Sequence, residues 1–181
     1  MTTLLILILT SLTIFIAYNI GALCVFGVPS SLSNTYYLYE NKKRGLGWLF
    51  PAMMWSMGFT LLPAWLELGE IISPWSTYLN VLAFFTCAAI CFVGAAPAFR
   101  ANLLESAVHN ISAKVAAATS ILWCLIVCWK IMYVPLGVAG LIALVAWLSK
   151  TFKSGLVYWL EMMAFGATFA TVITELIIHI N

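Results

Sequence analysis

Two glutamate–histidine pairs are the residues in this chain that come nearest to metal chemistry. Glu105 precedes His109 by four positions, and Glu175 precedes His179 by the same interval. This spacing places both side chains of a pair on one face of a helix, and carboxylate and imidazole groups are ligands for transition metals. A single pair is more often an interfacial ion pair or hydrogen bond. A joint metal site would need all four groups within a few ångströms of one another.

Four of the five cysteines repeat this spacing, Cys87 with Cys91 and Cys124 with Cys128, while Cys24 stands apart. Thiolates are soft ligands and could hold copper(I) inside a helical bundle. Because no histidine or methionine constellation accompanies the cysteines, we favour the alternative that they serve as small apolar residues where helices approach closely. We therefore predict five free thiols, no metal site and no cofactor.

A polar stripe runs along the last apolar stretch of the chain. Its members share one helix face and are Glu161, Thr168, Thr171, Glu175 and His179. Four of them follow one another at intervals of seven, seven and four positions, which places them within about 40° on a helical wheel, with Thr171 at the edge. An ionisable side chain inside a span usually faces protein or water; the alternative is that both carboxylates snorkel from near the helix ends. We predict that they face the interior, with Lys114 near Glu161 and Lys130 near Glu175.

The candidate residues named above lie in or beside long apolar stretches of the sequence. The 181-residue chain is 64% hydrophobic and 8% charged, whereas soluble domains have about 25% charged residues. A spanning helix needs roughly 20 apolar residues, and the continuous runs lack the alternation of barrel strands. We predict an all-α integral membrane protein, a six-helix bundle forming a single transmembrane domain over residues 1–181. The expected helices cover residues 4–26, 45–65, 74–99, 111–134, 135–148 and 155–180.

The basic residues predict the orientation of the bundle. Seven of the eight lie in the first, third and fifth expected loops, including the run Lys42–Arg44, and Lys130 alone lies toward the other side. Cytoplasmic loops are enriched in lysine and arginine, so we predict that these three loops are cytoplasmic and that the N and C termini are extracytoplasmic. The two glutamate–histidine pairs would then lie about 30 Å apart across the bilayer, which argues against a joint metal site.

Three short segments resemble a family of six-helix membrane proteins. They are Pro29, Leu32 and Ser33 after the first apolar stretch, Leu49–Pro51 at the start of the second, and His109 with Ala113 at the start of the fourth. The family contains the DRAM-type autophagy modulators, the GPI-anchor remodelling proteins and bacterial relatives of unknown function. The resemblance covers residues from about 29 to 125. It implies a six-helix bundle that handles or senses lipids, with Ser33 and His109 as corresponding positions and no catalytic role for them.

Three functions are compatible with the sequence. The leading hypothesis is a non-enzymatic membrane protein whose bundle binds lipid or another apolar ligand, or which serves as an accessory or scaffold subunit. One alternative is a small ion- or proton-coupled transporter or channel that uses the polar stripe. The other is a membrane-embedded lipid-modifying enzyme with His109 as base and Ser33 or Ser106 nearby, which convergence of these side chains on one cavity would favour.

The expected partners follow from the same observations. Membrane lipids are the first, and a protein partner or a second copy of the chain is compatible with the bundle. We take Ser33, Glu105 and His109 as the candidate site for a lipid headgroup or ligand. The net charge of +2 gives no indication of nucleic acid binding.

Overall fold

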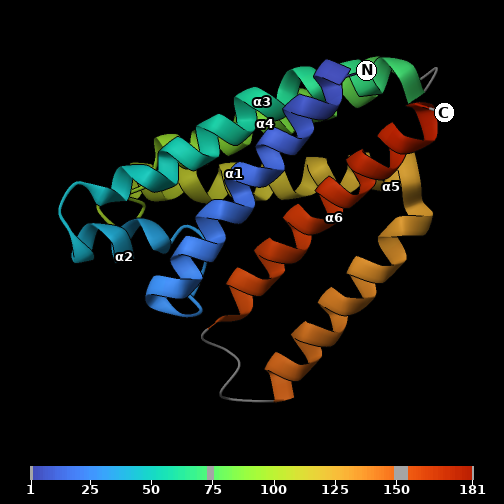
Figure 1. The fold of residues 1–181 in the computed structure, drawn as a ribbon. Coiled ribbons are helices and arrows are strands. Elements are labelled where there is room, and N and C mark those ends of the chain that lie inside the picture. Colours follow the sequence, from blue (N-terminus) through green and yellow to red (C-terminus); the bar gives the residue numbers. More distant parts are fainter. Residues whose placement is uncertain (1, 73–75, 149–154, 181) are drawn as a thin grey trace.

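The computed structural model describes residues 2–72, 76–148 and 155–180; of the side chains in the second half of the longest helix, from residue 129 onward, it describes only some. All the regular structure in this part of the chain is helical. The α-helices are α1 (Thr2–Phe26), α2 (Thr35–Lys42), α3 (Leu49–Ile72), α4 (Ser76–Ala95), α5 (Leu103–Leu148) and α6 (Leu156–Ile180), and the 3-10 helix η1 (Leu46–Trp48) leads into α3 (Figure 1).

Five helical segments in the described ranges are long and apolar enough to cross a membrane. They are α1, η1 together with α3, α4, the first part of α5 up to Cys128, and α6. Large apolar side chains on their outer faces are exposed, as at Phe59 (69%) and Phe92 (58%). Helices that are apolar on both faces are expected where lipid replaces water around a bundle. The predicted class, an all-α protein with the helices of a multi-pass membrane protein, agrees with this architecture.

The second and third expected spans differ from the helices in their bounds. We expected the second span to end at Trp65 beside Pro63, but α3 continues through this proline to Ile72. Proline removes one backbone hydrogen bond, which neighbouring helices in a membrane bundle can compensate. The third expected span reaches residue 99, whereas α4 ends at Ala95.

The fourth and fifth expected spans together form α5, in which two helical segments meet at a kink. The predicted boundary at Val134 and Pro135 is wrong, because the backbone leaves helical geometry earlier, at Cys128, with φ −145° and ψ 66°. Beyond this kink the helix turns back toward the end of the bundle at which α6 begins (Figure 1). As a result α1 begins and α6 ends at the same end of the molecule (Figure 1).

The start of α5 explains the role of Glu105. Its backbone N–H donates to Asn102 Oδ1 over 2.8 Å, and its carboxylate accepts from Asn102 Nδ2 over 3.0 Å. Asn102 is thus the N-cap of α5, because its side chain accepts the Glu105 N–H, a backbone donor that has no partner inside the helix. The Glu105 carboxylate binds the side chain of the capping Asn102, and it makes no hydrogen bond or ion pair with His109 among the described residues.

Close approach of α3 and α4 depends on two glycines. A Cβ at Gly58 would lie 2.7 Å from Cys91 Sγ, and one at Gly94 would lie 3.0 Å from Met54 Cβ. Cys87 on the same face of α4 is 1% exposed. Small residues allow this approach in membrane bundles, so the cysteines on α4 lie where the small-residue hypothesis expects them.

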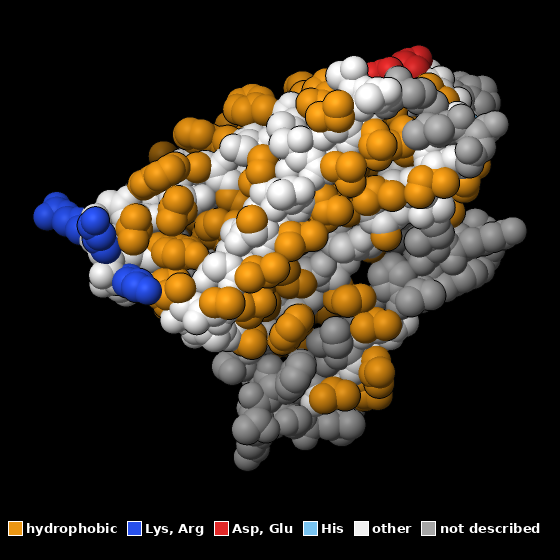
Figure 2. Space-filling model, in the orientation of Figure 1, with side chains coloured by type: hydrophobic (Ala, Val, Ile, Leu, Met, Phe, Trp, Pro, Cys, Tyr) orange, Lys and Arg blue, Asp and Glu red, His pale blue; other side chains and the backbone are white. Residues whose placement is uncertain are grey.

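Charged side chains gather at the two ends of the bundle, with apolar side chains covering the surface between them (Figure 2). The end that carries lysine and arginine contains α2 and the run Lys42–Arg44. At this corner the Glu40 carboxylate accepts backbone N–H groups of Gly45 and Gly47 at 2.9–3.1 Å, and these donors lower its pKa. Gly45 adopts φ +90°, a conformation that glycine accepts without strain.

Candidate functional site

Ser33 and His109 meet at the end of the bundle that contains α2. Ser33 lies in the segment between α1 and α2, and His109 lies in the second turn of α5. The Ser33 Oγ and His109 Nε2 atoms are 2.8 Å apart. Both residues are buried, at 6% and 5% exposed. The pair that sequence resemblance singled out is thus in direct contact, although 76 positions separate the two residues.

The partners of His109 determine its tautomer. Its Nδ1 lies 2.9 Å from the carbonyl oxygen of Ala96, which can only accept a hydrogen bond. Nδ1 must therefore carry the proton in the neutral ring, and Nε2 accepts from the Ser33 hydroxyl. The imidazole also stacks on Phe99, with ring centroids 4.5 Å apart and an interplanar angle of 27°. Stacking and the Ala96 carbonyl together hold the ring in one orientation.

Glu161 from α6 contacts the same segment one residue earlier. Its Oε2 accepts the backbone N–H of Leu32 over 2.6 Å. The Leu32 carbonyl accepts from the Thr35 hydroxyl, and the Tyr18 hydroxyl lies 2.5 Å from Thr35 Oγ1. Because the Thr35 proton is used toward Leu32, Tyr18 donates to Thr35. Both backbone polar groups of Leu32 are thus fixed by side chains, which orients Ser33.

Arg100, between α4 and α5, fixes the other side of the segment. Its Nη2 donates to Asn34 Oδ1 over 2.8 Å, and its backbone N–H donates to the Tyr37 hydroxyl over 2.7 Å. The guanidinium also lies over the Tyr37 ring, 4.9 Å from the centroid, within the range of a cation–π contact. The residues from Leu32 to Tyr37 are therefore held by groups from four parts of the chain.

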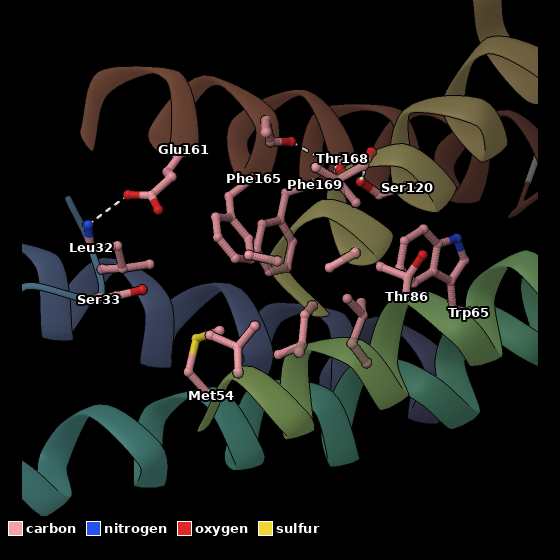
Figure 3. A pocket seen from close by; sticks show the side chains of 17 residues that line it. Leu32, Ser33, Met54, Trp65, Thr86, Ser120, Glu161, Phe165, Thr168 and Phe169 are labelled. Carbon is pink, nitrogen blue, oxygen red and sulfur yellow. Dashed lines mark hydrogen bonds between the residues drawn. The ribbon is translucent and has the colours of Figure 1, made fainter. Parts of the chain in front are cut away.

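A cavity of about 100 Å³ extends from this segment into the bundle. Its lining comes from the 31–34 segment and from α3, α4, α5 and α6, and is mainly apolar. Figure 3 shows Leu32, Ser33 and Glu161 at one end, Phe165 and Phe169 in the middle, and Trp65, Thr86 and Ser120 at the other end. His109 lies behind Ser33 and does not line the cavity.

The polar stripe on α6 faces the interior over most of its length. Thr168, Thr171 and Glu175 are 7%, 0% and 6% exposed. Each threonine hydroxyl donates to a carbonyl one turn earlier in α6, at 2.9 Å, so neither needs a partner from another helix. His179 is partly exposed, and its Nδ1 lies 2.9 Å from the Glu175 carbonyl and 3.9 Å from its carboxylate.

The structure tests only one of the two lysines expected to pair with this stripe. Lys114 is exposed on α5, and no ion pair joins it to Glu161 among the described residues; the Glu161 carboxylate binds Leu32 instead. The side chain of Lys130 lies outside the described residues. Within the described ranges, no group of three or more histidine, cysteine or acidic side chains is arranged to hold a metal ion.

Sequence reasoning missed two parts of this site. One is the Ala96 carbonyl that orients His109, because a backbone acceptor leaves no residue signature. The other is the set of small residues on α5 and α6 that leaves the cavity open, among them Ala113, Ala116, Ala117 and Ala164. A stripe of alanines three and four positions apart is a signal for one helix face, but the same stripe is also typical of close helix packing.

Comparison of the chain with protein-family models, with curated proteins and with solved structures finds no match. The resemblance to the six-helix family of lipid-handling proteins therefore stays a prediction that depends on the three segments described for it.

Proposed function

We propose that the bundle binds the apolar chain of a single-chain membrane amphiphile in the central cavity. The observation that supports this function is the cavity itself, an apolar space of about 100 Å³ with a polar end. An engineered cavity of about 150 Å³ with an apolar lining stays dry and binds benzene. A cavity of this size and character accordingly accepts a short length of alkyl chain.

The polar end favours an amphiphile that carries a hydroxyl group. Glu161 uses Oε2 for the Leu32 amide, which leaves Oε1 to accept a hydrogen bond from a ligand. A carboxylate favours a donor such as a hydroxyl over another carboxylate, because like charges repel. A monoacylglycerol or a fatty alcohol fits both the apolar and the polar part of the cavity. Its chain lies beside Phe165 and Phe169, and its hydroxyl lies beside Glu161.

Filling the cavity is expected to weaken this binding. Ala164 lines the cavity, whereas Ala170 on the same helix is exposed. We expect Ala164→Phe to reduce labelling of the protein by a photoactivatable monoacylglycerol at least about fivefold, since overpacking costs about 1–3 kcal/mol. Ala170→Phe should label like the wild type.

Ala117→Leu, in the part of the cavity lining that α5 contributes, is a second variant for the case that Ala164→Phe does not fold. Equal labelling of the wild type and of both cavity variants, all folded, would contradict the proposal, as would labelled peptides that lie only on the lipid-facing surface.

We also propose that the end of the bundle with Lys42–Arg44 faces the cytoplasm. The observation that supports it is that this end gathers the lysine and arginine side chains of Figure 2. Because α1 begins and α6 ends at the other end in Figure 1, this orientation would put both termini outside the cytoplasm. Basic residues are retained on the cytoplasmic side.

A topology reporter tests this orientation. We expect a reporter fused after the last residue to be active only on the extracytoplasmic side, and one inserted between Lys43 and Arg44 to be active only in the cytoplasm. The reverse pair of results would show that the bundle is inserted the other way.

A further inference from the structure

We propose that Ser33 is a nucleophile activated by His109 and that the bundle cleaves the ester bond of the amphiphile in its cavity. This inference rests on the proposed function, because it assigns a reaction to the ligand bound there. The substrate class is a carboxylic ester of a hydroxyl-bearing alcohol, of which a monoacylglycerol is the simplest example.

The geometry of the serine–histidine contact supports this role. A hydroxyl becomes nucleophilic when a base within about 2.6–3.2 Å accepts its proton and a third group orients that base. Ser33 Oγ lies 2.8 Å from His109 Nε2, and the Ala96 carbonyl, 2.9 Å from Nδ1, is the third group. With the proton of the neutral ring on Nδ1, the lone pair of Nε2 points at the Ser33 hydroxyl.

The placement of Ser33 gives it access to the substrate. It lines the cavity at the end where Glu161 also lies (Figure 3), while His109 lies behind it and outside the lining. An ester group at the junction between the apolar chain and the alcohol would therefore reach this end when the chain lies along Phe165 and Phe169. Ser106, the other serine considered near His109, is hydrogen-bonded to Asn110 one turn further along α5 and does not line the cavity.

The reaction needs no co-reactant other than water. Ser33 Oγ attacks the ester carbonyl carbon while its proton moves to His109 Nε2, and a bond forms between Oγ and the acyl carbon. The bond between that carbon and the alcohol oxygen then breaks, and His109 gives its proton to the departing alcohol. In the second half, water attacks the acyl-Ser33 ester with His109 again as base, which releases the fatty acid and restores the Ser33 hydroxyl.

Glu161 acts as a positioning residue in this scheme. Its bond to the Leu32 N–H fixes the backbone immediately before the nucleophile. Its second oxygen accepts a hydroxyl of the alcohol portion, which places the ester next to Ser33. Glu161→Gln retains an oxygen that accepts from Leu32, so we expect a higher KM for the hydroxyl-bearing ester with little change in kcat.

An alkyl fluorophosphonate tests the nucleophile directly, because an activated serine displaces fluoride and keeps the phosphorus group. We expect the purified wild-type protein in detergent micelles to gain one equivalent of label, located on Ser33 by peptide mass spectrometry. Ser33→Ala should remove the label, and His109→Gln should slow labelling by about 10²–10⁴-fold, the usual contribution of a general base. Ser106→Ala is the matched control and should label at the wild-type rate.

Two probes separate this inference from the proposed function. A short fluorophosphonate needs only the polar end of the cavity beside Ser33, whereas the photoactivatable monoacylglycerol reports on the apolar part that holds its chain. Labelling of Ser33 by the short probe without photolabelling of the cavity would retain the nucleophile and overturn the binding proposal. Photolabelling of the cavity with no modification of Ser33 in the folded wild type, and no fatty acid released from monoacylglycerol, would overturn the nucleophile.

Discussion

Replacing Trp123 with alanine is expected to lower the free energy of unfolding by about 3–5 kcal/mol, the range for large-to-small changes at tryptophan in a packed core. Trp123 on α5 is 0% exposed and meets Trp65 on α3 edge to face, with ring centroids 5.2 Å apart. Its indole N–H has no hydrogen-bond partner among the described residues. The expected loss therefore comes from packing and the aromatic contact, and not from a hydrogen bond.

The measurement is reversible unfolding of the purified protein in mixed micelles, followed by tryptophan fluorescence and helix content. Trp48→Ala is the control, because Trp48 is 60% exposed in η1 and exposed substitutions usually change stability by less than about 0.5 kcal/mol. A similar loss in both variants would contradict the assignment of Trp123 to the core. Since Trp65 lines the cavity, Trp123→Ala should also weaken photolabelling there by removing the support behind Trp65.

The sequence predicts the class of fold because the strongest physical constraint acts on composition. Backbone groups must be hydrogen-bonded within lipid, so long apolar runs without period-2 alternation leave helices as the solution. This argument gives the positions of α1 and α6 to within two residues at each end. The argument is weaker for the ends of helices that lie inside a longer apolar stretch. Pro63 suggested an end for the second span, but it lies inside α3.

The bend in α5 shows why the boundary between its two helical segments could not be derived from hydropathy. From Ile121 to Val134 the sequence has no proline or glycine and a single charged residue, Lys130, and the proline that suggested a boundary is Pro135, seven positions after Cys128. The backbone departs from helical geometry at Cys128, a residue with no intrinsic tendency to break a helix. Proline and glycine–serine pairs are the usual sequence signals of a sharp kink, and none stands at this position, so a count of apolar residues does not locate the bend.

The candidate site was found in part by resemblance and not by spacing. Regular spacing drew attention to Glu105 beside His109, but the Glu105 carboxylate binds Asn102 at the start of α5 and the contact of His109 is with Ser33. Helical periodicity detects neighbours on one helix, whereas this pair joins a non-helical segment to a helix. The inward face of the α6 stripe could be predicted from the sequence because the stripe is a periodic feature of one helix. The bond between Glu161 and the Leu32 N–H could not, because it joins α6 to a non-helical segment.

Replacing His109 with phenylalanine is expected to cost about 2–4 kcal/mol of stability. Phenylalanine can keep the stack on Phe99, but it removes both hydrogen bonds of the imidazole. The Ala96 carbonyl and the Ser33 hydroxyl are then left without their partner in a buried place, and each such group costs about 1–3 kcal/mol. Ser33→Ala alone leaves His109 Nε2 unpaired and should cost about 1–3 kcal/mol for the same reason.

The double variant distinguishes a direct pair from two independent effects. With Ser33→Ala present, His109→Phe no longer leaves a hydroxyl unpaired, so the double variant should lose less stability than the sum of the single variants, by about 1 kcal/mol or more. His179→Phe near the end of α6, where the imidazole is partly exposed, serves as the control and should be additive with Ser33→Ala. Strict additivity of Ser33→Ala and His109→Phe would mean that the two side chains do not share a hydrogen bond in the membrane protein. The nucleophile proposed for this site would then lose its base, because proton transfer requires the contact that the cycle measures.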